Sequence, residues 1–332
     1  MADPAWGAKL TGKVGANNLG VFVTRDRINN LLIPSNQFSR IDSVEQEVTG
    51  GVLRYSRDVG RSSAVGAIYT GREANGYHNR VAGLDTVIQL ASADSIDIQF
   101  LHSDTLYPEE VRERQEQTPD AFAGEAFLVE YRHNTRHWYW SASFEDFSPG
   151  FRADFGFVPR VDTRTVEGDF GRTWWSDRSS RWVSFQLGGG YERTIDYDGT
   201  LTDETIDLDL WYRGPLQTSV FFVPSINKEF FNGVTFDLAR AFFQSEIQPS
   251  GTVKLRLSGV LGDEIDSFNT QKGDLLNLRP GMELKLGRHI NLDLSHSFQR
   301  LDVAGGRLFE ENLTEARIYY YHNVRTLVRL IT

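Results

Sequence analysis

The chain has 332 residues, contains no cysteine and carries a formal net charge of −10 at pH 7. The missing cysteines exclude disulfide bonds and thiolate chemistry, and the acidic charge argues against nucleic-acid binding, because neutralising phosphates requires a surplus of Lys and Arg. No stretch approaches the roughly 18 consecutive apolar residues that a transmembrane helix needs. The length suits two ordinary domains or one large all-β architecture.

Short segments in which apolar and polar residues alternate recur along the whole chain. In chain order, clear examples lie at 84–90, 96–100, 183–188, 206–210, 253–257 and 290–295. Alternation with a period of two predicts β-strands with one apolar and one polar face. In one of them, Val183, Phe185 and Leu187 share a face, and Ser184 and Gln186 lie on the other. The sequence therefore predicts an all-β fold.

The alternation leaves open which face meets water. In a soluble sandwich or propeller the apolar face points into a shared core, whereas in an outer-membrane barrel it faces lipid and the polar face lines the lumen. The intervening residues are often charged, as with Asp207 and Asp209 or Lys254 and Arg256. Such charges favour a solvated face over a second packed layer.

The lengths of the predicted connections favour the barrel. We expect roughly eighteen strands, joined alternately by short and long connections, as in outer-membrane barrels. The short ones lie at 15–18, 91–95, 133–137, 176–181, 248–251 and 287–289, and the long ones at 29–47, 107–124, 147–165, 263–273 and 302–312.

The positions of the aromatic residues give an independent indication. Trp and Tyr prefer membrane interfaces, where the ring is buried and its polar atom stays hydrated. The predicted aromatic girdle, at the end with the short turns, consists of Trp138, Trp140, Trp174, Trp175, Trp182, Trp211 and Tyr320.

These observations predict an antiparallel transmembrane β-barrel of the bacterial outer membrane, with about 18 strands here and about 20 in the intact protein. We expect one barrel domain spanning 1–332. With the short turns in the periplasm, both chain ends would lie outside the cell, whereas bacterial barrels normally keep their ends in the periplasm. The N-terminal sequence also shows no secretory signal. We therefore expect a fragment that lacks an upstream domain and terminal strands.

Two stretches carry a resemblance to a known family. They are GAKLTGKVGANNLGVFVTRD at 7–26 and FSPGFRADFGFVPRVD at 147–162. The chain resembles the C-terminal barrel module of large bacterial surface proteins in which a family-9-like carbohydrate-binding domain precedes the barrel. Members carry a signal peptide and this domain upstream and usually extend past the VRTLVRLIT end found here; this sequence has neither. The resemblance implies an outer-membrane location more firmly than an activity, and it implies no enzymatic role for the barrel.

The segment at 147–162 is the best candidate for a functional loop, because it combines aromatic rings with charges of both signs. Its candidate binding residues are Phe151, Arg152, Asp154, Phe157, Arg160 and Asp162. The loop could pack into the lumen as a plug or constriction, bind a ligand at the barrel mouth, or carry a rim-located hydrolase site. No nucleophile motif is present, so no catalytic residue is assigned.

Alternation also predicts which polar residues line the lumen. They are Arg54, Asp85, Glu130, Arg132, Asp207, Asp209, Lys254, Arg256, Glu283, Lys285 and Arg317. Mixed charge of this kind can hold water and select solutes, or form ion pairs across the barrel. The histidines and carboxylates show no metal-binding spacing, so no metal and no cofactor are expected.

The function expected from the sequence is a channel or transport conduit for polar solutes that also anchors the protein in the membrane. One alternative is a plugged module that anchors or binds glycans at the surface, and a second is a rim-located hydrolase. The expected partners are outer-membrane lipid and a glycan or small polar solute, with no nucleic acid and with a monomeric barrel.

Overall fold

The computed structural model describes residues 4–177, 181–323 and 325–332, and almost all of its regular structure is β-strand. The first strands are β1 (Pro4–Val14), β2 (Asn17–Asp26), β3 (Asn29–Pro34), β4 (Ser39–Val44), β5 (Val48–Val59), β6 (Ser63–Ala74), β7 (Tyr77–Ala91), β8 (Asp94–Leu106), β9 (Phe122–Asn134) and β10 (Trp138–Phe147). The later strands are β11 (Thr163–Trp175), β12 (Ser184–Ile195), β13 (Leu201–Arg213), β14 (Ser219–Phe231), β15 (Val234–Ser250), β16 (Val253–Asp266), β17 (Gln271–Leu286), β18 (Ile290–Val303), β19 (Gly306–Asn323) and β20 (Thr326–Ile331). A short helix, α1 (Glu109–Arg114), lies between β8 and β9.

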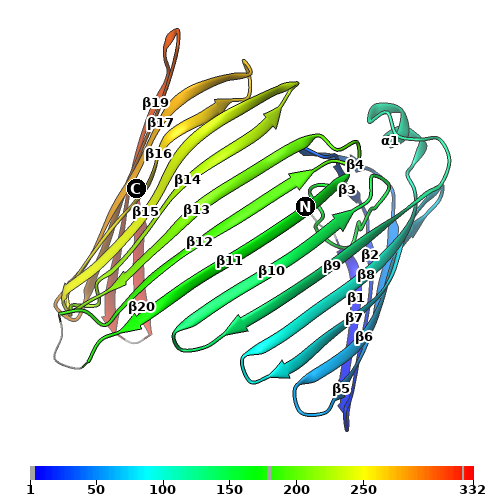
Figure 1. The fold of residues 1–332 in the computed structure, drawn as a ribbon, viewed down its shortest axis with the longest axis horizontal. Helices are drawn as coiled ribbons and strands as arrows, with labels where there is room; N and C mark the ends of the chain where they lie inside the picture. The colour runs from blue at the N-terminus through cyan, green and yellow to red at the C-terminus, as the bar shows by residue number, and fades with distance from the viewer. Residues whose placement is uncertain (1–3, 178–180, 324) are drawn as a thin grey trace. The chain divides into compact units, whose positions relative to one another are not determined.

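Eighteen of the described strands form one sheet, and β3 and β4 form a separate hairpin inserted between β2 and β5 (Figure 1). Neighbouring strands pair antiparallel in β1–β2, in β2–β5, along β5 to β9 and along β13 to β20. A pairing of β1 with β20, which would close the sheet, is not among the pairings of the described strands. The predicted all-β, antiparallel architecture with about eighteen strands is confirmed.

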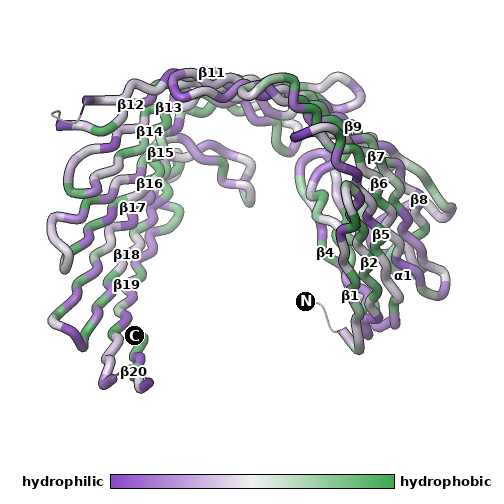
Figure 2. Tube along the Cα trace, turned by 90° about the horizontal axis from the view of Figure 1, so that it is seen from below, coloured by the Kyte–Doolittle hydropathy of each residue, from purple (hydrophilic) through white to green (hydrophobic). Residues whose placement is uncertain are grey.

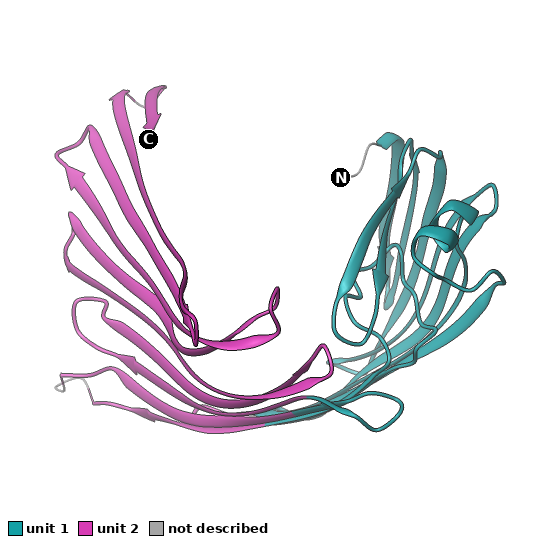
Figure 3. Cartoon of the chain, turned by 90° about the horizontal axis from the view of Figure 1, so that it is seen from above, with its two compact units in different colours: residues 1–134, 140–168, 193–202 teal, residues 135–139, 169–192, 203–332 magenta. Residues whose placement is uncertain are grey.

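The chain divides into two compact units, coloured separately in Figure 3. Unit 1 comprises 1–134, 140–168 and 193–202, and it contains β1 to β9, the β3–β4 hairpin and α1. Unit 2 comprises 135–139, 169–192 and 203–332, and it contains β14 to β20. The strands β10 to β13 contribute residues to both units.

In unit 2, hydrophilic and hydrophobic residues alternate along β16 to β19, as the colours in Figure 2 show. Because successive side chains of a strand point to opposite faces, the two faces of the sheet differ in chemistry. On one side, the register places Glu283 opposite both Lys254 and Asp293, and Asp293 opposite Arg317. We call this side the polar face. The other side is the apolar face, where Leu284 lies opposite Leu292. The predicted alternation is thus kept from strand to strand by the register.

Unit 1 shows the same division. Phe100 lies opposite Leu84 on one neighbouring strand and opposite Phe127 on the other, which defines the apolar face of this unit. Asp97 lies opposite Glu130 on the polar face. The exposed fraction of Leu84 is 65% and that of Phe100 is 45%, so the structure leaves these large apolar side chains uncovered by protein.

Three long connections, at 27–47, 107–121 and 148–162, lie at one end of the strands of unit 1. The turn between β6 and β7 at that same end is short, and the connections from β14 onward are short at both ends of the strands. The long connections predicted at 29–47, 107–124 and 147–165 are confirmed: they contain the β3–β4 hairpin, α1 and a loop at 148–162. Those predicted at 263–273 and 302–312 are wrong, because β16 and β17 pair out to Asp266 and Gln271, and β18 and β19 pair out to Val303 and Gly306. A backbone ladder needs no apolar side chains, so it continues through these polar segments. The turn predicted at 176–181 includes 178–180, which lie outside the described residues.

The described residues contain no helix that is both long and apolar enough to cross a membrane.

Candidate functional site

The loop at 148–162, which joins β10 to β11, packs against the polar face of unit 1. Phe151 is fully buried, and it forms a cluster with Val81 of β7, Ala126 of β9 and Val161 at the far end of the loop. Val81 and Ala126 belong to the polar-face row of their strands, so the loop covers this face and not the apolar one. Burying a phenylalanine side chain stabilises such a contact by roughly 1.5–3 kcal/mol.

Two glycines allow the loop backbone to touch the strand backbone. A Cβ atom on Gly124 of β9 would lie 2.1 Å from the Phe151 nitrogen, and one on Gly150 would lie 2.2 Å from the Ala123 oxygen. Both contacts are with backbone atoms, which cannot rotate away. Any side chain at either position would therefore push the loop off the sheet.

Buried polar side chains of the strands fix the loop by hydrogen bonds to its backbone. Asn79 on β7 is 1% exposed; its Nδ2 donates to the Arg152 carbonyl at 3.0 Å, and its Oδ1 accepts from the Asp154 N–H at 2.9 Å. On β8, the Ser103 hydroxyl accepts from the Arg152 N–H at 3.1 Å. These bonds satisfy backbone groups that would otherwise be buried without a partner.

Arg72 on β6 ties this loop to the β3–β4 hairpin. Its guanidinium donates to the carbonyl oxygens of Asp154 and Asn30, both at 3.0 Å, and to the Asn29 Oδ1 at 2.9 Å. The Tyr77 hydroxyl donates to the Asp154 Oδ2 at 2.7 Å. Burial raises the pKa of the Asp154 carboxyl above its ordinary value, although this hydrogen bond and the nearby Arg72 charge oppose the rise.

The other candidate binding residues of the loop have different environments. Arg160 donates to the Asn36 carbonyl at 2.7 Å and to the Thr202 hydroxyl at 3.2 Å, so it also holds loops together. Asp162 adopts a positive φ of 60°, and its Oδ1 accepts from the Tyr197 N–H at 3.0 Å. Phe157 is 79% exposed. Of the six candidates, Phe157 alone presents most of its side chain to solvent.

The structure brings the six candidates onto one loop but does not bring them together around a cavity. Arg152 is buried and donates to the Pro149 and Phe151 carbonyls at 2.9 and 2.8 Å. Phe151 and Asp154 are used in packing and in the Tyr77 hydrogen bond. These contacts fix the loop at 148–162 across the polar face of unit 1, and none of them indicates a hydrolytic site.

A second apolar cluster forms where the hairpin and α1 meet the strand ends of unit 1. It consists of Leu31, Ile33, Val44, Val48, Tyr77, Tyr107 and Val111, with Ala74 and Phe122 packed against it. The residues that hold these loops are not among the predicted site residues; they are Arg72, Tyr77, Asn79 and Ser103. Their polarity and phase resemble those of lumen-lining residues, and no local signal indicates that a distant loop covers them.

The predicted lumen residues of unit 1 lie on the polar face and form ion pairs. Arg54 Nη2 donates to Asp85 Oδ1 at 2.7 Å, reaching across β6. Gly66 on β6 makes this possible, because a Cβ there would lie 2.6 Å from Arg54 Nη2. Arg132 pairs with Asp97, which the prediction omitted, and its Nη1 lies 3.4 Å from Glu130 Oε2.

The predicted lumen residues of unit 2 also lie on the polar face, and many pair across neighbouring strands. Arg256 lies 3.0 Å from Glu283 and 2.8 Å from Asp293, and Lys254 lies 2.9 Å from Glu246. Arg317 pairs with a glutamate on its own strand. The predicted residues Asp207, Asp209 and Lys285 follow the same alternation on β13 and β17.

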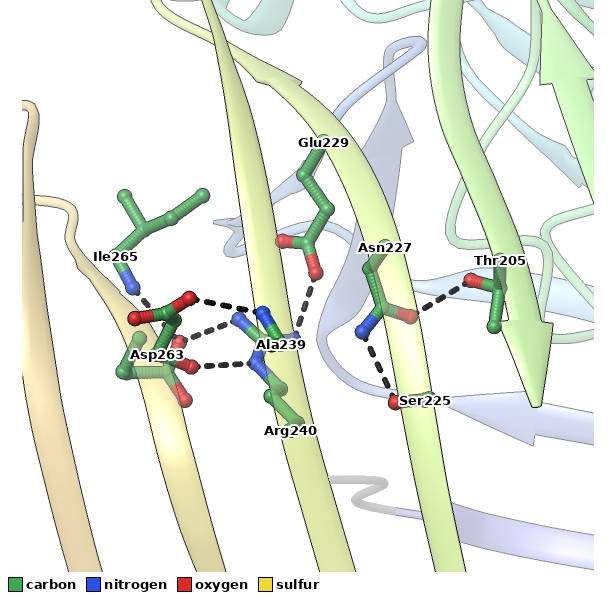
Figure 4. A network of polar contacts seen from close by, with 9 residues as sticks. Thr205, Ser225, Asn227, Glu229, Ala239, Arg240, Asp263 and Ile265 are labelled. Atoms are coloured by element: carbon green, nitrogen blue, oxygen red, sulfur yellow. Dashed lines mark hydrogen bonds and ion pairs between the residues drawn. The ribbon is translucent and has the colours of Figure 1, made fainter. Parts of the chain in front are cut away.

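Figure 4 shows a polar network in unit 2, near the turns that join β14 to β15 and β16 to β17. Arg240 on β15 donates to Glu229 at 2.6 Å, to Glu264 at 3.1 Å and to the Asp263 carbonyl at 2.7 Å. Asn227 on β14 accepts from Thr205 at 3.0 Å on β13. Arg240 is not among the predicted lumen residues, although its position in the polar row of a strand is a signal that could have identified it.

The predicted girdle residues all lie near the ends of strands, beside connections that the sequence predicted to be short. Trp138 and Trp140 lie in the first three residues of β10, and Trp174 and Trp175 are the last two residues of β11. Trp182 precedes β12, and Trp211 and Tyr320 lie near the ends of β13 and β19. The ring centroids of Trp138 and Phe170 are 5.4 Å apart, and Phe170 is 55% exposed on the apolar face.

The face occupied by two of these tryptophans is a correction to the expected girdle. Trp211 lies opposite Phe221, in the row of Asp209, and therefore on the polar face of unit 2. Trp175 follows Trp174 directly, so the two cannot share a face. For both tryptophans, the position in the sequence predicted the strand end at which they lie, but it did not predict the face of the sheet that they occupy.

Within the described ranges, no group of three or more His, Asp and Glu side chains is arranged to hold a metal ion.

An antiparallel sheet with one charged face and one exposed apolar face defines the class: the fold is that of the outer-membrane β-barrels, and the location it indicates is the bacterial outer membrane. Among solved structures, the chain is similar to the copper transporter OprC, with a TM-score of 0.53 and 9% sequence identity over 96% of this chain and 63% of that one. The chain thus spans less than two thirds of OprC, and at this identity the likeness concerns the fold alone.

A structure described as a bacterial polysaccharide outer membrane secretin also matches, with a TM-score of 0.39 and 12% identity over 94% of this chain and all of that one. That lower score adds nothing to the fold assignment. No family model and no curated protein matches the chain.

Proposed function

We propose that the chain forms an outer-membrane β-barrel that conducts small polar solutes and anchors the protein in the membrane. One observation carries the proposal: charged side chains pair from strand to strand along the polar face of unit 2, while the apolar face of the same strands stays uncovered. Arg256 with Glu283 and Asp293 represents the first part. Leu255 and Leu257, which are 40% and 41% exposed, represent the second.

The physical reason is the environment that each face requires. Exposed apolar rows on consecutive strands would make a soluble protein aggregate, whereas lipid acyl chains cover them without a penalty. Half-exposed ion pairs are stable in water but not in hydrocarbon. Water on one side and lipid on the other satisfies both faces. OprC is described as a transporter, which agrees with a conducting role.

The direct experiment is single-channel recording after reconstitution of the purified chain in planar bilayers. We expect steady current, and we expect Arg256→Gln to shift ion selectivity toward cations, because Glu283 and Asp293 lose their shared counter-charge. Leu257→Ile is the matched control. Leu257 is next to Arg256 on β16 but lies on the apolar face, so this substitution should leave ion selectivity unchanged. Folded and inserted protein that carries no steady current would contradict conduction.

A second candidate is a plugged module that anchors or binds glycans, which the loop at 148–162 favours because it packs over the polar face of unit 1. Phe157 is the exposed ring that could stack on a sugar. Under this alternative the wild type is non-conducting, and Phe157→Ala weakens retention of cellohexaose. The family resemblance adds the further proposal that the barrel anchors an upstream carbohydrate-binding domain.

A further inference from the structure

One arginine of unit 2 lies in an apolar row. Arg172 on β11 is exposed and shares its face with Phe170 and Trp174, two residues before and after it. Phe170 is 55% exposed, and on the next strand Phe185 and Leu187 are 36% and 40% exposed. The guanidinium is therefore surrounded by side chains of the apolar face.

Two tryptophan rings hold the guanidinium. The Arg172 Cζ lies 4.8 Å from the ring centroid of Trp138 and 4.9 Å from that of Trp174. Trp138 in turn packs on Phe170, with ring centroids 5.4 Å apart, and Trp174 packs on Phe185 at 5.8 Å. Both rings are thus fixed by neighbours on the same face. A cation over an aromatic ring is stabilised by about 0.5–1 kcal/mol at an exposed site.

The rings do not use the hydrogen-bonding capacity of the guanidinium. Its five N–H donors lie in the plane of the group, whereas a ring attracts it through its face. Among residues 4–177, 181–323 and 325–332, no carboxylate lies within ion-pair distance of Arg172. Two other arginines in apolar-face rows do have such partners: Arg80 lies 2.6 Å from Glu73, and Arg25 lies 2.5 Å from Glu47.

The depth of Arg172 matches the headgroup region of a membrane. It lies three residues from the end of β11, about 10 Å along the strand, at the end where the tryptophans gather. Tryptophan marks the boundary between acyl chains and headgroups. The negatively charged group at this depth is the phosphodiester of a phospholipid, and planar N–H forks bind such oxygens well.

We propose that Arg172, Trp138 and Trp174 form a docking site for the phosphodiester headgroup of a membrane phospholipid, whose acyl chain lies along Phe170 and Phe185. The proposal rests on the membrane placement given under the proposed function, but not on conduction. The rings orient the guanidinium, its N–H groups donate to the phosphate oxygens, and the exposed apolar side chains contact the lipid tail.

The test uses native mass spectrometry of the whole chain in dodecyl maltoside micelles, titrated with dioleoyl phosphatidylglycerol. We expect Arg172→Gln to weaken the tightest lipid-binding step about fivefold, the loss typical of one basic residue at a membrane surface. Arg57→Gln is the matched control, because Arg57 lies on β5 near a short connection, in the row of the exposed apolar Leu53, without a ring partner among the described residues. It should leave this step unchanged.

Two further arms complete the test. Arg172→Lys keeps the positive charge and should lose less lipid affinity than Arg172→Gln. The lysine variant can therefore be titrated in its place if the glutamine variant folds poorly. Inorganic phosphate at the lipid concentration should not compete, because it lacks the acyl chain. Equal lipid binding by wild type and both variants, or competition by phosphate, overturns the docking site. A wild type that does not enter micelles as folded protein contradicts the membrane placement instead.

Discussion

The contact between Gly124 and the loop at 148–162 gives the sharpest prediction. In Gly124→Ala the new methyl group would lie 2.1 Å from the Phe151 nitrogen and 2.5 Å from its Cα. Because both are backbone atoms, the loop must lift. Phe151, now fully buried, then loses its cover, along with the Asn79 hydrogen bonds to the loop.

The size of the effect follows from these losses. Exposing Phe151 removes roughly 1.5–3 kcal/mol, and each lost hydrogen bond about 1 kcal/mol, partly regained by contact with water. We expect a decrease of about 2–4 kcal/mol in the free energy of unfolding if the whole loop separates, with the lower value for partial relaxation.

Two assays report on this change. Guanidinium unfolding in detergent micelles, followed by tryptophan fluorescence, measures stability, and limited trypsin digestion measures access to the Arg152–Ala153 bond. Wild type should resist cleavage there because Arg152 is 7% exposed, whereas Gly124→Ala should be cut early. Gly12→Ala is the control, since a Cβ at Gly12 meets nothing within 4 Å. Equal stability and equal cleavage of Gly124→Ala and wild type would refute the packing argument.

Three more predictions concern the same face. Arg72→Met should lower the free energy of unfolding by about 2–4 kcal/mol, because it leaves acceptors of the loop and the hairpin unpaired, and an unchanged guanidinium midpoint would contradict this. The pKa of Asp154 is raised in the folded chain, so this carboxyl contributes most to stability below its unfolded pKa, and the contribution falls as the pH rises through its folded pKa. Asp154→Asn should therefore flatten this pH-dependent fall in a profile of unfolding free energy recorded from about pH 4 to about pH 7. A profile identical to that of wild type would count against this prediction. Gly66→Ala displaces only the flexible end of Arg54, so it should change the free energy of unfolding by less than about 1 kcal/mol while altering channel selectivity. A loss of stability as large as that of Gly124→Ala would mean that the strand itself is disturbed.

Much of the architecture was predictable because a period of two leaves little freedom. Once Leu255 and Leu257 are placed on one face, Lys254 and Arg256 must occupy the other, and the observed register extends this to Glu283 and the strands beyond. The long connections predicted at 29–47, 107–124 and 147–165 likewise indicated one end of the strands of unit 1. These features follow from local sequence alone.

The strand ends and the loop contacts were less predictable, for physical reasons. Segments such as 263–273 are as polar as loops, yet their backbone pairing continues, because it does not depend on side-chain polarity. Arg72 and Asn79 alternate like lumen residues, but their partners lie about 80 residues away in sequence, on a loop whose path only the tertiary structure defines. The side occupied by Trp211 depended on its phase, not on its preference for interfaces.

The central claim is that the apolar face contacts lipid while the polar face contacts water. Because the chain contains no cysteine, single cysteines can be placed at 254, 255, 256 and 257 on β16 and spin-labelled after reconstitution in vesicles. The account predicts that labels at 255 and 257 collide preferentially with oxygen, and those at 254 and 256 with a water-soluble nickel complex. Collision rates that do not alternate along these four positions would contradict it.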